Sequence, residues 1–172
     1  MTGCGSGSDG NQASGDAAKS STGLPPAPTA FDPCSSAMQP VLDSEHLSHQ
    51  TKEDSDGNGG TQWRGCQWVS YSGDGYTVSI RSTNITLPMI RANNGFRVAE
   101  QVELSGRTAL VYHNSDATDT MHNCAINAEL KGGSLEFSLD NPASNEVTGS
   151  TDTCEIGKRL ASKVVDLVPP SA

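Results

Sequence analysis

The sequence predicts an α+β domain: an antiparallel sheet of about five or six strands, with N- and C-terminal helices packed on one face and with two disulfides. Three observations favour this fold class. Short segments of alternating apolar residues are separated by turn residues, an apolar stripe with helical spacing lies near the C-terminal end, and four cysteines are spread through the same region. Strands joined by short turns pair antiparallel, and helices can cover one face of such a sheet.

The chain of 172 residues divides by composition into a polar segment and a single domain. Residues 3–30 consist mostly of Gly, Ser, Asp, Ala, Thr and Pro, so they bury too little apolar surface to offset the entropy lost when a backbone is ordered. We expect residues 1–30 to be a disordered tether, residues 31–168 to form the α+β domain, and residues 169–172 to be a tail.

The charge pattern argues against one class of partner. The formal net charge is −9, and the eleven Lys and Arg residues are scattered along the chain rather than clustered. Nucleic acids are bound through their phosphates by clustered positive side chains, so we expect no nucleic-acid partner. The sequence also contains no apolar run long enough to predict a transmembrane helix.

The first part of the domain is expected to be helical and then polar. Asp32 followed by Pro33 is typical of a helix start, because Asp can cap free backbone N–H groups and Pro fits the first turn. We expect a second helix over residues 40–47, beginning at a proline, and a polar loop over residues 49–61. The buried edge of the second helix would contain Val41, Leu42 and Glu45.

Alternating apolar residues predict three β-hairpins in the middle of the chain. The paired segments are 63–71 with 76–80, 98–104 with 108–112, and 122–130 with 134–139. Residues 83–95, which contain Pro88, match neither a strand nor a helix. The inward-facing side chains would include Tyr76, Val78, Ile80, Val98, Val102, Leu104, Cys124, Ile126, Ala128, Leu135, Phe137 and Leu139.

The last predicted element is an amphipathic helix. Asp152 and Glu155 have the spacing of a capping box, so the helix is expected to begin next to Asp152. Lys158, Arg159 and Lys163 would point away from the core. The apolar stripe contains Ile156, Leu160, Val164 and Leu167.

Four cysteines of the domain are expected to form two disulfides. Cys34 and Cys154 follow helix-start signals, whereas Cys66 and Cys124 lie in predicted strands. Three pairings are possible. We favour Cys34–Cys66 and Cys124–Cys154, because each then joins a helix start to a strand and closes a loop of about thirty residues, worth roughly 3.5–4 kcal/mol in the chain-entropy model. A four-thiolate zinc site and a reactive thiol remain alternatives, although the paired Cys spacing typical of zinc sites is missing.

The fifth cysteine, Cys4, lies in a different setting. Met1-Thr2-Gly3-Cys4 resembles the end of a bacterial lipobox, in which a small residue and Gly precede a cysteine that becomes lipidated. The Gly/Ser-rich residues that follow are typical of a flexible tether. We therefore expect Cys4 to anchor the protein to the outer face of the cell membrane. The alternative is a chance cysteine in a disordered terminus.

One segment resembles the first half of a calcium-binding loop. Asp54, Asp56 and Asn58 match the pattern D-x-D-x-N-G, but the twelfth position, which needs a bidentate Glu, is Gly65. We therefore predict no metal site there, with these three residues as the only candidates.

No recognised catalytic or cofactor-binding motif is present in the sequence, so we expect neither enzymatic activity nor a cofactor. His46 and His49 are spaced i, i+3 near a predicted helix end and could form a metal pair, although exposed histidines are more common. Aromatic residues gather along the first hairpin. We expect Trp68 in the core, and Trp63 with Tyr71 as a possible binding surface.

Four cysteine contexts together resemble a known family. Phe31-Asp32-Pro33-Cys34, Cys66-Gln67-Trp68, Asn123-Cys124 and Asp152-Thr153-Cys154 are similar to the cysteine frame of actinobacterial secreted lipoproteins that are catalogued as a domain of unknown function. The resemblance implies an envelope location and two disulfides, and it implies no catalytic residue.

These observations lead to two functional hypotheses. The first is a non-enzymatic cell-envelope lipoprotein whose domain binds a protein, a lipid or a wall component. The alternative is a metal-dependent module, using calcium or zinc, or a hydrolytic module, built from residues 43–58.

Overall fold

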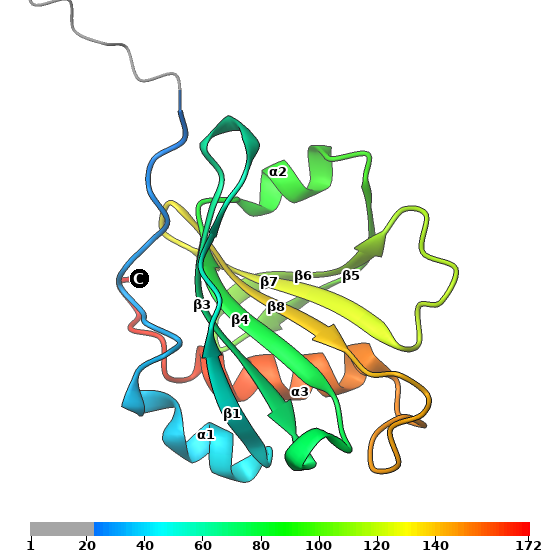
Figure 1. Cartoon of the computed structure of the whole chain (residues 1–172). Helices are drawn as coiled ribbons and strands as arrows, with labels where there is room; N and C mark the ends of the chain where they lie inside the picture. The colour runs from blue at the N-terminus through cyan, green and yellow to red at the C-terminus, as the bar shows by residue number, and fades with distance from the viewer. Residues whose placement is uncertain (1–22) are drawn as a thin grey trace, which may run out of the picture.

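The computed structural model describes residues 23–172, and within this range an antiparallel sheet of eight strands forms the centre of the domain. The strand order is β1-β3-β4-β8-β7-β6-β5, and the short β2 pairs with β3 (Figure 1). The α+β class is therefore confirmed, with more strands than expected. The strands are β1 (Leu47–Lys52), β2 (Ser55–Asp56), β3 (Gln62–Ser70), β4 (Thr77–Thr83), β5 (Phe96–Leu104), β6 (Arg107–Asn114), β7 (Asn123–Leu130) and β8 (Gly133–Asp140).

The two additional strands are β1 and β2, which lie mostly in the segment predicted as a polar loop at residues 49–61; β1 begins at Leu47, which was expected to end the second helix, whereas α1 ends at Ser44. Both pair with β3, and the end of β1 beyond Ser48 is exposed. An exposed edge strand needs no apolar side, so its sequence lacks the alternation by which strands are recognised. The prediction of a loop was therefore wrong here.

The helices lie on both faces of the sheet. They are α1 (Gln39–Ser44), α2 (Leu87–Ala92) and α3 (Thr153–Val165), with short 3-10 turns η1 (Ser36–Met38), η2 (Asn58–Gly60) and η3 (Tyr71–Gly73). Residues of α1 and α3 share the main core with one face of the sheet. Residues of α2 form a smaller cluster with Leu110 and Tyr112 on the other face (Figure 1). This helix falls in the segment 83–95 that the sequence left unassigned, and Pro88 stands in its first turn.

The main core contains the side chains that alternation predicted. Trp68, Tyr76 and Phe137 are fully buried at its centre, and the predicted stripe of α3 packs onto β7 and β8. Val98 is an exception. A β-bulge between Val98 and Glu100 shifts the register of β5 by one residue, so Val98 joins the α2 cluster while Val102 remains on the main core.

Both predicted disulfides are present. Cys34 is bonded to Cys66, and Cys124 to Cys154. Cys154 begins α3 as expected, where the Asp152 carboxylate accepts hydrogen bonds from the N–H groups of Cys154 and Glu155. Cys34 does not begin a helix. Its N–H donates to the Asp32 side chain (2.9 Å) within an isolated turn, and helical structure begins only at Ser36.

The chain packs onto the domain before Phe31. Ala27 is buried and donates its N–H to the Gln62 side chain (3.0 Å), and the Asn84 amide donates to the Pro25 carbonyl (2.7 Å). The described part of the predicted tether is therefore attached to the sheet from at least Pro25. Cys4 lies outside the described residues. Within residues 23–172, the structure has no helix with the length and hydrophobicity needed to span a membrane.

Candidate functional site

An open groove of about 660 Å³ lies where the β3–β4 turn meets the end of α1. Its lining combines one exposed aromatic ring, an imidazole, hydroxyls, two carboxylates and apolar side chains. We call it the Tyr71 groove; it is lined by Leu42, Asp43, His46, Leu47, Ser48, Tyr71, Ser72, Asp74 and Val147.

Three non-glycine residues of the Tyr71 groove have a left-handed backbone. The φ angles are 54° at His46, 49° at Tyr71 and 56° at Ser72. This conformation costs about 1–2 kcal/mol for an L-residue with a Cβ. Such strain persists only where surrounding contacts enforce it, and it gathers at functional sites. Its concentration here therefore identifies the groove as the strongest candidate site among the described residues.

Contacts between the two turns hold the aromatic pair in place. The rings of His46 and Tyr71 stack with centroids 4.6 Å apart, and the Tyr71 N–H donates to the His46 carbonyl (3.0 Å). Tyr71 nevertheless keeps 38% of its surface exposed. An exposed ring fixed in one orientation can stack on a ligand without losing much conformational entropy on binding.

The opposite wall of the groove is a loop organised by two asparagines. The buried Asn141 bonds the Thr148 carbonyl (2.8 Å), and Asn145 donates to the Gly75 carbonyl (2.9 Å). The Val147 N–H donates to the Asp74 carbonyl (3.1 Å), so the loop is fastened to the β3–β4 turn. Val147 is 49% exposed at the edge of the groove, so its side chain is accessible to a ligand.

A buried carboxylate lies directly behind His46. Glu45 is bonded by Arg159 (2.8 Å), Lys163 (2.6 Å) and the Tyr76 hydroxyl (3.0 Å). Burial alone would raise the pKa of Glu45, but the hydrogen bonds and charge of Arg159 and the bond from Lys163 outweigh it and hold the pKa at about 2. Burial, together with the neighbouring charge of Glu45, raises the pKa of Tyr76. This network fastens the end of α1 to α3 and so fixes the base of the groove.

The structure separates the two aromatic residues that the sequence grouped. Tyr71 follows the end of β3, whereas Trp63 lies at its beginning, roughly 26 Å away at the rise of an extended strand. Trp63 is partly buried, its Nε1–H donates to Glu136 (3.1 Å), and Arg81 lies over its ring at 6.0 Å. Trp63 and Tyr71 therefore do not form one surface; alternation along a strand identifies a face but not which end of the strand is open.

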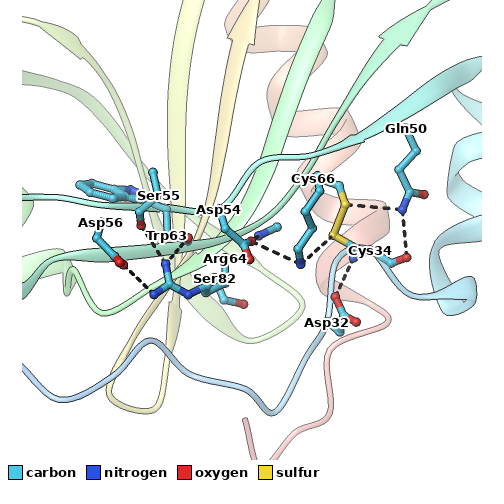
Figure 2. Close-up of polar contacts among 12 residues, drawn as sticks. Asp32, Cys34, Gln50, Asp54, Ser55, Asp56, Trp63, Arg64, Cys66 and Ser82 are labelled. Carbon is cyan, nitrogen blue, oxygen red and sulfur yellow. Dashed lines mark hydrogen bonds and ion pairs between the residues drawn. A yellow bond between two sulfur atoms is a disulfide. The ribbon is translucent and has the colours of Figure 1, made fainter.

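In the incomplete calcium loop, both aspartates form ion pairs with basic side chains of the same chain (Figure 2). Asp54 pairs with Lys52 (3.3 Å) and accepts from the Gly65 N–H (3.0 Å), while Asp56 pairs with Arg64 (2.6 Å). Among residues 23–172, the one cluster of His, Cys, Asp or Glu ligand atoms close enough to hold a metal ion contains neither aspartate.

Neither of the two histidines His46 and His49 lies within a helix. His46 follows the end of α1 and stacks on Tyr71, whereas His49 lies in the bulge of β1 with a φ of 57°. The sequence analysis did not identify Asp74 and Val147 as residues of the Tyr71 groove. They come together because a loop far along the chain brings Val147 to the turn that contains Asp74.

Comparison with known proteins identifies a family. A family model described as "Protein of unknown function (DUF3558)" matches residues 1–167. No curated protein and no solved structure matches the chain. The matched region covers both disulfides and the Tyr71 groove. The chain therefore belongs to the DUF3558 family of proteins of unknown function.

Proposed function

We propose that this chain is a non-enzymatic lipoprotein of the cell envelope, anchored through a lipid on Cys4, whose Tyr71 groove binds a glycan of the cell wall. The observation that carries the proposal is the coincidence of three left-handed residues, His46, Tyr71 and Ser72, with an open groove and a fixed, exposed aromatic ring. In this proposal, the lipid on Cys4 holds the domain at the outer face of the membrane, and the Tyr71 groove contacts the glycan.

Two features of the chain support an extracytoplasmic location. Disulfides form and persist in oxidising compartments, and this domain contains two. The Met1-Thr2-Gly3-Cys4 sequence resembles the end of a lipobox, and the polar residues after it suit a tether between a membrane and a domain.

The position of the groove relative to the tether supports contact with the wall. The described chain begins at the start of β3: a Cβ added to Gly60 would lie 3.5 Å from the Gly23 Cα. The Tyr71 groove lies at the other end of the nine-residue β3, roughly 30 Å away. The point where the described chain begins and the Tyr71 groove therefore lie at opposite ends of β3, so attachment of the domain through its N-terminal side leaves the groove open.

The chemistry of the groove favours a sugar over a lipid. Sugar rings present C–H faces that pack on aromatic rings, and their hydroxyls donate strong hydrogen bonds to carboxylates such as Asp43 and Asp74. The same carboxylates repel anionic lipid headgroups, and an open groove cannot enclose an acyl chain. A protein partner with a basic segment is the competing occupant, and it is favoured if the parent protein does not sediment with glycan in the test below.

The groove is tested by sedimentation with purified, insoluble cell-wall glycan. We expect the protein to co-sediment, Tyr71→Ala to lose at least about tenfold in affinity, as one stacked aromatic ring contributes, and Val147→Ala to lose less. Met121→Ala is the matched control, because Met121 is 41% exposed and is absent from the groove lining. Equal sedimentation of all variants contradicts binding by the groove, and no sedimentation of the parent contradicts glycan binding.

The anchor is tested separately. Protein expressed from its full reading frame in its native host should carry a diacylglyceryl adduct on Cys4 by mass spectrometry. Cys4→Ser should move the protein from the membrane fraction to the soluble fraction while glycan binding is retained. A free Cys4 thiol in the membrane-associated protein contradicts the anchor and leaves the groove untouched.

A further inference from the structure

A buried histidine lies beside the second disulfide without a strong hydrogen-bond partner. His113, on β6, is 8% exposed, and its Nε2 lies 3.6 Å from the Cys154 Sγ. Its Nδ1 is buried and has no partner within residues 23–172. Buried polar atoms are nearly always bonded, so an imidazole whose one side-chain hydrogen-bond partner among the described residues is a disulfide sulfur needs an explanation.

The three side chains have the composition and spacing of a zinc site. The ligand atoms of His113, Cys124 and Cys154 all lie within 4.8 Å of one another. Tetrahedral zinc, with bonds of about 2.3 Å to sulfur and 2.0–2.1 Å to nitrogen, requires a sulfur–nitrogen separation of about 3.6 Å. The separation between Nε2 and the Cys154 Sγ already has this value.

Rigid elements hold all three residues. Cys124 lies in β7 and Cys154 in the first turn of α3, which is fastened by two bonds from Thr153 to the Met121 carbonyl (2.9 Å from the N–H and 2.6 Å from the hydroxyl). Two zinc–sulfur bonds of about 2.3 Å at a tetrahedral angle place the sulfurs about 3.8 Å apart. Once the disulfide is open, the two sulfurs therefore need to separate only to this distance, and the backbone can stay in place.

A small pocket leads to these atoms. The pairing of β6 with β7 ends at Tyr112 and Ala125, and beyond that pair the strands diverge. The pocket of about 140 Å³ that opens there is lined by His113 and Cys124 among others. It offers an entry path for an ion and room for a water as fourth ligand.

We propose that reduction of the Cys124–Cys154 disulfide creates a zinc site whose ligands are the two thiolates and the His113 Nε2. A dithiol reductant supplies two electrons and two protons, so the S–S bond breaks, two thiols form and the reductant becomes a disulfide. Zinc then displaces the two thiol protons. Two thiolates balance the charge of the ion, so the buried site carries no net charge. The site is independent of the Tyr71 groove.

The test uses the full chain with Cys4→Ser, which removes an unrelated thiol. The disulfides are reduced with a phosphine, which takes an oxygen from water and leaves no thiol of its own in solution. Zinc is titrated against a chromophoric chelator, and cobalt is used as an optical probe, because thiolate ligands give it a charge-transfer band. We expect one equivalent bound by the reduced protein and none by the oxidised protein.

Two variants locate the site. His113→Gln should bind zinc at least about tenfold more weakly, whereas the matched His122→Gln should bind like the parent, since His122 pairs with Asp119 outside the cluster. Zinc should also raise the melting temperature of the reduced parent but not of reduced His113→Gln.

Three results would overturn the proposal. They are absence of one-equivalent binding by the reduced protein, equal affinity of His113→Gln and the parent, or a reduced protein whose near-ultraviolet circular dichroism shows an unfolded core both with and without zinc. The last result counts against the site because binding by unfolded thiols would not need the geometry described above.

Discussion

Replacing Glu45 by glutamine should remove the part of the acid sensitivity of the fold between pH 4.5 and pH 2 that comes from the Glu45 carboxylate. The structure lowers the pKa of Glu45 from 4.5 to about 2. At about 1.4 kcal/mol for each tenfold change in proton affinity, the ionised carboxylate contributes about 3 kcal/mol to folding. Since the folded pKa is depressed, this stability is fully present above pH 4.5 and is lost as the pH falls toward 2.

The assay is urea unfolding of the parent and of Glu45→Gln at a series of pH values, followed by the fluorescence of the buried Trp68. The difference in unfolding free energy should be about 3 kcal/mol at pH 7 and should shrink toward zero near pH 2. Glu129→Gln, which alters an exposed carboxylate on β7, is the control and should match the parent throughout. A difference that stays constant with pH would refute the charged network behind the groove.

Three further substitutions test the fold. Gly65→Ala should abolish soluble expression, because its Cβ would lie 2.0 Å from the Ile80 carbonyl oxygen on β4; normal yield would contradict the close strand approach. Asn84→Ala, which removes the bonds to the Pro25 and Gly60 carbonyls, should lower stability by about 1–3 kcal/mol and speed proteolysis near Pro25, so unchanged protection would contradict the attachment. Trp63→Phe, which leaves Glu136 without this donor, should lower the melting temperature but leave groove binding unchanged.

The sequence predicted the elements whose signals are local. Hairpins with alternating apolar residues and the stripe of α3 are visible in short windows, and the disulfide pairing followed from matching helix starts to strands. Cys34 shows the limit of such signals. Asp32 and Pro33 predict a helix start, but the Asp32 side chain instead closes a turn on the Cys34 N–H. The same residues stabilise both structures, and only tertiary packing decides between them.

The features that the sequence did not predict depend on distant contacts. Ala27 is held at the sheet by a hydrogen bond to the distant Gln62 side chain. The side chain of Val98 faces α2 because of a β-bulge between Val98 and Glu100, where Glu100 pairs with Val111 on β6. The stacking of Tyr71 on His46 joins two turns that lie 25 residues apart in the chain, so no local pattern around Tyr71 reveals it. The sequence analysis named Tyr71 as a possible surface residue and placed His46 within the alternative module of residues 43–58, but it did not bring the two together in one groove.

The most direct test of the proposed function is a titration of the ¹⁵N-labelled protein with soluble fragments of cell-wall glycan, followed by amide chemical shifts. The account predicts saturable shifts confined to the groove, led by His46, Tyr71, Ser72 and Val147, and their loss in Tyr71→Ala. Shifts at the opposite end of β3, around Trp63, or no shifts at millimolar glycan, would contradict it.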